Sequence, residues 1–222
     1  MTIAEGIKTL KGKPAEIPNC SRNDLPAFFK EMGFKTVVEI GVYKGENLEI
    51  YGNSGLEVYG IDPWRLYKDY GNPRGQKRLD DQHNMTLERL KPYPNLHIIR
   101  KTSMEALEDF EDGSLDAVYI DGNHQFAYVA EDMYHWAIKL KQGGVLSGHD
   151  YARYKSKSIC GGCHAKEVVD AYAYAYNIPN FWVLGQKKMP ANLDPAKGEI
   201  RDQFRSWLIV KDYATPQHVL KN

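Results

Sequence analysis

A glycine-containing turn between two apolar segments constrains the fold of this chain more than any other feature. The segment Val37–Ile40 leads into a turn bracketed by Gly41 and Gly45, and the apolar segment Val58–Ile61 ends at Asp62. A nearly continuous β-branched run is typical of a strand that is covered on both faces. Glycine lets a turn approach a ligand closely, because it carries no Cβ. The pattern therefore predicts a strand, a turn, the start of a helix and a second strand.

The same turn has the properties of a nucleotide-binding site. Backbone N–H groups at the start of a helix after Gly45 lack partners and favour a carboxylate or a phosphate. A carboxylate at the tip of the next strand, here Asp62, can accept two hydrogen bonds from a ribose diol. The spacing Glu-x-Gly-x-x-x-Gly from Glu39 to Gly45 resembles motif I of the class I S-adenosylmethionine (SAM) methyltransferases, and Asp62 resembles their ribose-binding acidic residue.

This resemblance implies a set of SAM-binding residues at the ends of the strands. Glu39 would hold the turn or meet the amino group of the methionine moiety. Ser103 stands where an adenine-contacting residue would lie, with a plain helix cap as the alternative. The implied cofactor-binding residues are Glu39, Gly41, Tyr43, Gly45, Asp62, Pro63, Trp64, Thr102, Ser103 and Asp121.

Strand-like and helix-like segments alternate along the rest of the chain. The expected strands are 36–40, 57–61, 96–100, 115–120, 145–147, 181–185 and 206–211. The expected helices are 22–32, 46–51, 81–90, 103–110, 126–140 and 165–176. Capping boxes at Ser21 and Thr102 open the first and the fourth, and Gly143 and Gly144 cap the fifth. Strand and helix in alternation imply a parallel sheet with right-handed crossovers, and the two adjacent closing strands suggest a hairpin.

The predicted fold class is α/β, with a Rossmann-like class I methyltransferase sheet. This sheet would be mostly parallel with a C-terminal antiparallel strand, and helices would cover both of its faces. Residues 1–20 are expected to form an N-terminal arm, and residues 21–222 the SAM-dependent methyltransferase domain. Two irregular stretches, 63–80 and 152–163, are expected to form a substrate lid, since long loops in compact domains are often functional.

Two later segments carry a second resemblance. Residues 118–124 contain Asp-Gly-Asn-His, and residues 140–151 contain Gly-Gly followed by His-Asp. Together they resemble the signature of a methyltransferase family that includes relatives of the cephalosporin hydroxylases and the macrolide-sugar O-methyltransferases. The resemblance covers about residues 35–185 and implies Asp121 and Asp150 as Mg²⁺ ligands, with a nearby histidine as base. His149 stands where some relatives carry an acidic ligand.

These residues suit the methylation of a hydroxyl group. A hydroxyl is a poor nucleophile at neutral pH, and a divalent cation lowers its pKa and orients it. Two carboxylates suit Mg²⁺, whereas an added imidazole shifts preference towards Mn²⁺, Fe²⁺ or Zn²⁺. The expected metal ligands are Asp121, His149 and Asp150. His124 and His149 are the expected catalytic residues, since a general base is the alternative to a metal. Purely local hydrogen bonding by His124 and Asp150 is the structural alternative.

Composition excludes several other classes of function. Acidic and basic residues balance at 29 each, which speaks against a nucleic-acid or anionic-membrane partner. We find neither an apolar run of membrane-spanning length nor a signal peptide, so the expected location is the cytoplasm. Cys160, Cys163 and His164 could hold zinc, form a redox pair or mark a tight turn, and the tight turn is favoured because a closed zinc site needs four ligands.

The sequence thus predicts a SAM-dependent methyltransferase that uses a metal to methylate a hydroxyl of a small, sugar-like or otherwise hydroxylated molecule. A non-catalytic SAM-binding protein and a metal-independent N-methyltransferase are the alternatives. An NAD-dependent oxidoreductase is disfavoured by the turn pattern and by the closing strand pair. Whether the chain forms a homo-oligomer is left open.

Overall fold

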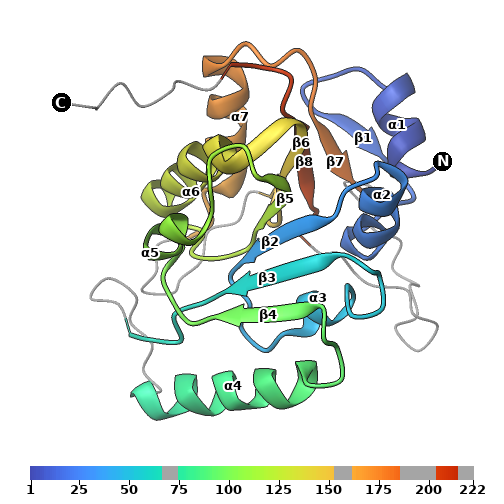
Figure 1. The fold of residues 1–222 in the computed structure, drawn as a ribbon. Helices are drawn as coiled ribbons and strands as arrows, with labels where there is room; N and C mark the ends of the chain where they lie inside the picture. Colours follow the sequence, from blue (N-terminus) through green and yellow to red (C-terminus); the bar gives the residue numbers. More distant parts are fainter. Residues whose placement is uncertain (67–74, 153–161, 186–203, 215–222) are drawn as a thin grey trace, which may run out of the picture.

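A single mixed sheet organises the chain in the computed structural model, which describes residues 1–66, 75–152, 162–185 and 204–214 (Figure 1). The order of its eight strands is β1-β7-β8-β6-β5-β2-β3-β4. The strands are β1 (Ala15–Ile17), β2 (Thr36–Ile40), β3 (Glu57–Ile61), β4 (Leu96–Ile99), β5 (Leu115–Ile120), β6 (Leu140–Gly148), β7 (Trp182–Leu184) and β8 (Trp207–Val210).

Helices connect most of these strands. They are α1 (Ile3–Thr9), α2 (Leu25–Glu31), α3 (Glu46–Glu49), α4 (Gly75–Leu90), α5 (Ser103–Ala106), α6 (Phe126–Lys139) and α7 (Ala165–Ala175), with short 3-10 turns η1 (Arg22–Asp24) and η2 (Leu107–Asp109). Capping boxes begin three of them, at Ser21 and Thr102 as the sequence predicts and also at Thr2. Each side-chain oxygen satisfies a backbone N–H that the first turn leaves without a partner.

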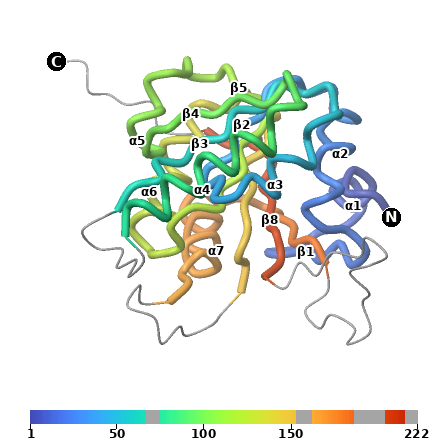
Figure 2. Tube along the Cα trace, turned by 90° about the horizontal axis from the view of Figure 1, so that it is seen from below, coloured from blue at the N-terminus to red at the C-terminus, as the bar shows by residue number. Residues whose placement is uncertain are grey.

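Helices cover both faces of the sheet, as predicted. Successive side chains of a strand point to opposite faces, and β5 shows the result: Val118 and Ile120 pack with α6 and α7, whereas Ala117 and Tyr119 pack with α1 and α2. In Figure 2 the strands lie between these two helix layers. Burial on both faces explains why the central strands are almost wholly apolar.

Strand directions also agree with the prediction. All pairs are parallel except those of β8, which runs antiparallel to β6 and to β7. The chain order reverses between β2 and β5, which are parallel neighbours. Ligands of open α/β sheets bind beyond the carboxyl ends of the strands at such a switch point.

The N-terminal segment differs from the expected arm. Residues 15–17 form β1, which pairs in parallel with β7 and extends the sheet at its edge. Ile3 and Ala4 of α1 are buried in the same apolar cluster as β1. The sequence of residues 1–20 is polar enough to suggest an arm, but Ile3, Ala4, Ala15, Ile17 and Cys20 are buried in the core.

Two element boundaries also differ from the prediction. Helix α4 begins at Gly75, six residues before its expected start, so the aromatic stretch after β3 is shorter than predicted. Gly143 and Gly144 lie within β6 rather than at a helix cap, and Gly143 donates a hydrogen bond to the Lys211 carbonyl. The central parts of the two proposed lid segments, residues 67–74 and 153–161, lie outside the described residues. Among the described helices, we find none that is both long and apolar enough to cross a membrane.

Candidate active site

A cavity of about 600 Å³ opens at the carboxyl ends of the central strands. It lies at the switch point between β2 and β5, where the topology places a ligand site. Every residue predicted to bind the cofactor lines this cavity except Gly45. The lining residues on which the argument below depends are Arg22, Glu39, Gly41, Tyr43, Asn47, Asp62, Pro63, Trp64, Gln82, Thr102, Ser103, Asp121, His124 and Asp132.

Gly41 is required by the turn itself. Its φ is 89°, in the left-handed region, and an added Cβ would lie 2.2 Å from the carbonyl oxygen of Asp121. The sequence suggested that a side chain here would block a ligand, but it would first collide with the end of β5. Gly45 also has a positive φ, and an added Cβ would lie 3.0 Å from Thr86 of α4. Both glycines therefore serve packing as well as turn conformation.

Asp62 holds the turn after β2 in place. Its Oδ2 accepts hydrogen bonds from the backbone N–H groups of Val42 at 3.1 Å and Tyr43 at 2.9 Å. Its Oδ1 accepts one from the N–H of Trp64 at 2.9 Å. Burial raises the pKa of this carboxyl, while the three backbone donors oppose that rise. Asp62, the predicted ribose-binding residue, therefore also fixes the backbone of the turn after β2 and of the loop after β3.

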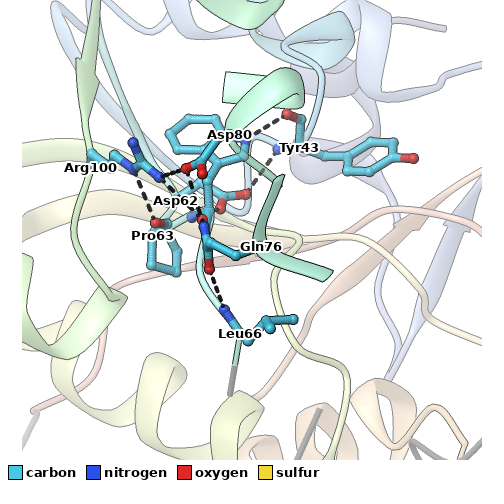
Figure 3. A network of polar contacts seen from close by, with 8 residues as sticks. Tyr43, Asp62, Pro63, Leu66, Gln76, Asp80 and Arg100 are labelled. Carbon is cyan, nitrogen blue, oxygen red and sulfur yellow. Dashed lines mark hydrogen bonds and ion pairs between the residues drawn. The ribbon is translucent and has the colours of Figure 1, made fainter. Parts of the chain in front are cut away.

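The loop after β3 is fixed by polar side chains of α4 and β4 (Figure 3). Gln76 donates to the carbonyl of Trp64 at 2.7 Å and accepts from the N–H of Leu66 at 3.2 Å. Arg100 donates to the carbonyls of Pro63 and Trp64 and pairs with Asp80. These contacts place the loop against the cavity with its backbone groups satisfied.

Tyr43 and Trp64 both have left-handed backbones, with φ of 53° and 40°. The carbonyl of Tyr43 accepts from the indole N–H of Trp64 at 2.8 Å and from the hydroxyl of Thr86 at 3.0 Å. Trp64 is buried, whereas the ring of Tyr43 is exposed at the cavity. A non-glycine residue in this region costs free energy, and the network around Asp62 compensates for that cost.

Glu39 presents a carboxylate oxygen without a partner at the base of the cavity. Its Oε1 accepts from the side-chain amide of Asn47 at 3.1 Å, while its Oε2 is buried and has no hydrogen bond. The Oδ1 of Asn47 is likewise buried and unpaired. Burial raises the pKa of Glu39 to about 8. This pKa means that Glu39 favours its neutral acid form near pH 7, and a ligand that brings a positively charged donor would favour the ionised form and satisfy the buried oxygens.

The sequence left open whether Ser103 caps a helix or contacts the adenine, and in the structure the helix cap is Thr102. Thr102 is the helix cap of α5, and its hydroxyl accepts from the N–H of Glu105 at 3.2 Å. Ser103 instead donates a hydrogen bond to Asp132 of α6, and both line the cavity. Burial raises the pKa of Asp132 to about 7. Ser103 therefore remains a candidate for ligand contact rather than a cap.

Asp121, His124 and Asp150 lie close together beyond the ends of β5 and β6, where Asp121 and His124 line the cavity and Asp150 is buried beside them. One ligand atom from each of these three side chains lies within 4.8 Å of the other two, close enough to share a metal ion. The Nε2 of His124 is 3.2 Å from Oδ2 of Asp150. Burial raises the pKa of Asp121 to about 6, although both neighbouring histidines and Arg22 act against that rise.

His149 takes a different position from the one the sequence implied. Its Nδ1 lies 3.2 Å from Oδ2 of Asp150 and 3.9 Å from Oδ1 of Asp121, so it contacts the two carboxylates. The group that could share an ion, however, contains His124 in its place. Only His124 of the two histidines lines the cavity. The structure therefore groups His124, which the sequence predicted as a base, with the two carboxylates, and the role of His149 as a ligand stays a prediction.

Asp150 reaches this group through a left-handed backbone with φ of 60°. Its N–H donates to the carbonyl of Phe204 at 2.9 Å, and the indole N–H of Trp207 donates to the carbonyl of His149 at 3.1 Å. The strand β8 thus holds the end of β6 in the conformation that turns the carboxylate towards His124. The cost of this conformation is met by surrounding contacts, as at other functional sites.

Sequence reasoning missed several lining residues. Arg22 lies 3.6 Å from Oδ2 of Asp121 and comes from a turn identified only as a helix start. Asn47, Gln82 and Asp132 come from helix faces, where a polar residue ordinarily signals exposure to solvent. Gln82 and Asp132 are buried polar side chains, but only the folded chain reveals that.

Comparison with known proteins identifies the family. The sequence profile of a family described as methyltransferase domain matches residues 38–151, about half of the chain. This range begins in β2 and ends after β6, so it spans the turn, the cavity and the group around Asp150. The chain belongs to this methyltransferase-domain family, and it is a SAM-dependent methyltransferase of class I fold.

Individual relatives are more distant. The chain is 25% identical over 176 residues to "Uncharacterized protein R132" of Acanthamoeba polyphaga mimivirus, covering 76% of this chain and 77% of the relative. It is 42% identical over 53 residues to "Uncharacterized protein y4gI" of Sinorhizobium fredii (strain NBRC 101917 / NGR234). That match covers 24% of this chain and 6% of y4gI, so the chain spans only a small part of that relative.

Solved structures share the fold at low identity. Cofactor-bound Rv0187 from MTB has a TM-score of 0.58 and 11% identity, over 87% of this chain and 80% of that one. The O-methyltransferase from Bacillus cereus in complex with SAH has a TM-score of 0.55 and 12% identity, over 86% and 80%. Likeness at such identity shows the fold alone.

Proposed function

We propose that this chain transfers the methyl group of SAM to a hydroxyl of a small, sugar-like or otherwise hydroxylated molecule, assisted by a divalent cation. The observation that carries the proposal is the grouping of Asp121, His124 and Asp150 at a cavity that the family's motif I turn also lines. Asp121 and His124 line this cavity, and Asp150 is buried beside them. The name of the similar Bacillus cereus protein, an O-methyltransferase, supports a hydroxyl acceptor.

The cavity suits SAM in size and in polarity. Its volume of about 600 Å³ lies within the range of small-molecule sites. The unpaired Oε2 of Glu39 and Oδ1 of Asn47 would receive the ammonium group of the methionine moiety. Asp62 keeps acceptor capacity on Oδ1, which takes a single hydrogen bond and can accept another from a ribose hydroxyl. Ser103 and Asp132 would face the adenine.

The Asp-His-Asp group suits a divalent cation. Two carboxylates and an imidazole favour Mn²⁺, Fe²⁺ or Zn²⁺ over Mg²⁺. Such a cation would supply a lowered pKa of the acceptor hydroxyl and a fixed orientation for it. The chain's own contribution is to hold the three side chains within reach of one ion, and His149 would keep the carboxylate of Asp150 aligned through its 3.2 Å contact.

A metal-free version has one observation in its favour. His124 lies 3.2 Å from Asp150, the arrangement in which a carboxylate orients an imidazole that acts as general base. In this version His124 takes the proton of the acceptor hydroxyl, and Asp150 stabilises the resulting imidazolium. The two versions share the same residues, so only the dependence on metal separates them.

Methyl transfer to a panel of sugars, catechols and amines, followed with labelled SAM, tests the proposal. We expect transfer to a hydroxylated compound that stops after exhaustive chelation and returns with Mn²⁺. Asp121→Asn should abolish the response to Mn²⁺, whereas Asp112→Asn, at an exposed ion pair with Lys139, should not. Full activity after chelation would contradict the metal-assisted version. Transfer to amines alone would contradict the choice of acceptor.

A further inference from the structure

The Cys-Gly-Gly-Cys-His stretch that the sequence analysis singled out ends beside the candidate metal site. Cys160 lies outside the described residues, but Cys163 and His164 are described, and they directly precede α7. Among the described residues, the group able to share a metal ion contains neither of them. Their contacts point to a different role from the zinc and redox hypotheses.

His164 is joined to the loop that follows β5 by two hydrogen bonds. Its N–H donates to the carbonyl of His124 at 2.9 Å. Its ring Nδ1 accepts from the N–H of Phe126 at 3.2 Å. The two partners stand on either side of Gln125, so the part of the loop next to α6, which includes the backbone of His124, is held by two bonds. An Nδ1 that accepts a hydrogen bond from an amide is also not available as a metal ligand.

His164 is itself anchored to a rigid element. Its carbonyl accepts from the N–H of Val168 at 3.0 Å, which closes the first turn of α7. Helix α7 packs against α6 through buried side chains that include Val168, Val169 and Met133. The position of the loop that carries His124 is therefore set by a helix more than thirty residues later in the chain.

Cys163 contacts the other loop of the site. Its buried thiol donates to the carbonyl of Asp150 at 3.6 Å. This carbonyl belongs to the residue with the left-handed backbone that turns its carboxylate towards His124. Adjacent residues of one short segment thus contact the two loops that supply His124 and Asp150.

We propose that Cys163 and His164 form a bracket that sets the separation between His124 and Asp150, and that His164 is a positioning residue for the metal site. The inference rests on the proposed function, because it assumes that these side chains bind a cation. Residues that orient metal ligands matter for affinity, and their loss weakens metal binding by about 10- to 100-fold.

The test compares the unmodified protein with three variants by Mn²⁺ affinity, hydrogen exchange and affinity for S-adenosylhomocysteine. The variants are His164→Ala, His164→Asn and, as a control, His97→Ala, which removes an exposed histidine paired with Glu57 at the far edge of the sheet. Asparagine can place its amide oxygen near the position of the histidine Nδ1, so it should keep the bond from Phe126. Mn²⁺ affinity is measured by electron paramagnetic resonance, and hydrogen exchange is measured on the peptide covering residues 121–128.

We expect His164→Ala to weaken Mn²⁺ binding by about tenfold and to accelerate exchange in the 121–128 peptide. Exchange in β5 itself should stay unchanged, which separates loop release from global unfolding. His164→Asn and His97→Ala should remain within about twofold of the unmodified protein, the usual range for neutral substitutions. Affinity for S-adenosylhomocysteine should not change in any variant. If His164→Ala does not fold, His164→Gln serves in its place, since its longer amide misses the Nδ1 position.

Two results are decisive. Unchanged Mn²⁺ affinity and unchanged loop exchange in His164→Ala overturn the bracket while leaving the metal site intact. Absence of Mn²⁺ binding in the unmodified protein overturns the metal part of the proposed function instead. In that case loop exchange alone decides whether His164 positions His124, because that measurement does not require a cation.

Discussion

The two ends of the cavity are held in different ways. At the β2–β3 end, residues 39–66, most stabilising contacts stay within that stretch or come from the next helix and strand, as Asp62 and Gln76 illustrate. At the β5–β6 end, residues 121–126 and 148–151, the contacts come from distant segments, through His164, Phe204 and Trp207. One end is organised locally, and the other is assembled by the completed fold.

We infer from this difference that one end of the cavity binds the cofactor and the other end holds the reacting groups. The β2–β3 end, which is organised locally, would bind SAM, the methyl donor. The β5–β6 end would bind the acceptor and the cation. The distant segments that support it can change in sequence without affecting the turn after β2. The two ends meet where the N–H of Asp121 donates to the carbonyl of Ile40, so we expect them to act separately only for side chains away from that contact. Substitution of such a side chain should affect one property and spare the other. The predictions below test that separation.

The largest effect is expected at Asp150. Its carboxylate contacts both His124 and His149, so Asp150→Ala removes one contact from each histidine. We expect turnover to fall about 1,000-fold, the range for loss of a metal or general-base function. Affinity for S-adenosylhomocysteine, measured by calorimetry, should stay within about twofold. A parallel loss of that affinity would show that the two ends are not separate.

The two histidines should differ in importance. His124 lines the cavity and belongs to the group that could share an ion, whereas His149 contacts the carboxylates from outside the cavity lining. We expect His124→Ala to reduce kcat about 100-fold and His149→Ala about tenfold, as for a metal ligand or base compared with its supporting residue. The comparison uses kcat at saturating SAM. A larger loss of kcat in His149→Ala than in His124→Ala would instead support His149 as the metal ligand, as the sequence implied.

At the locally organised end, Asp62→Ala should act mainly on cofactor binding. It removes the acceptor for the N–H groups of Val42, Tyr43 and Trp64 as well as the expected ribose contact. Leaving such donors unpaired costs about 1–3 kcal/mol, which we expect to appear as weaker SAM affinity in calorimetry. Asp80→Ala is a milder control, because Asp80 is exposed and contacts the loop after β3 indirectly, through its ion pair with Arg100. Unchanged affinity in Asp62→Ala would remove this residue from the cofactor site.

The same difference explains how much the sequence could predict. The turn from Glu39 to Gly45 and the carboxylate of Asp62 are short-range patterns, and their positions relative to the cavity agree with the prediction except at Gly45. Strand and helix alternation likewise predicted the sheet, including its antiparallel strand. By contrast, which of two histidines faces the cavity depends on contacts with His164 and Trp207, and such long-range pairings leave no local pattern.

Residues 1–20 illustrate the same limit. Their edge strand pairs only with β7, which lies more than 160 residues later, so its register could not be inferred from local alternation. Arg22 enters the cavity because η1 follows that strand. A polar composition predicted an arm, and the fold incorporated the segment into the sheet edge and into the cavity wall.

The smallest expected effect concerns stability at Asp132, on the helix that borders both ends. Burial raises its pKa from 3.8 to about 7, so the folded chain binds a proton that the unfolded chain releases. Its unfavourable contribution is therefore absent below about pH 4, grows as pH rises and is complete above about pH 7.

Asp132→Asn removes the ionisable group and keeps an oxygen to accept the hydrogen bond from Ser103. We expect the variant to gain about 1–3 kcal/mol in free energy of unfolding at about pH 8 and much less at about pH 5, measured by urea denaturation. Asp112→Asn, at an exposed ion pair, should show no such gain. An equal gain at both pH values would mean that packing, and not ionisation, governs this position.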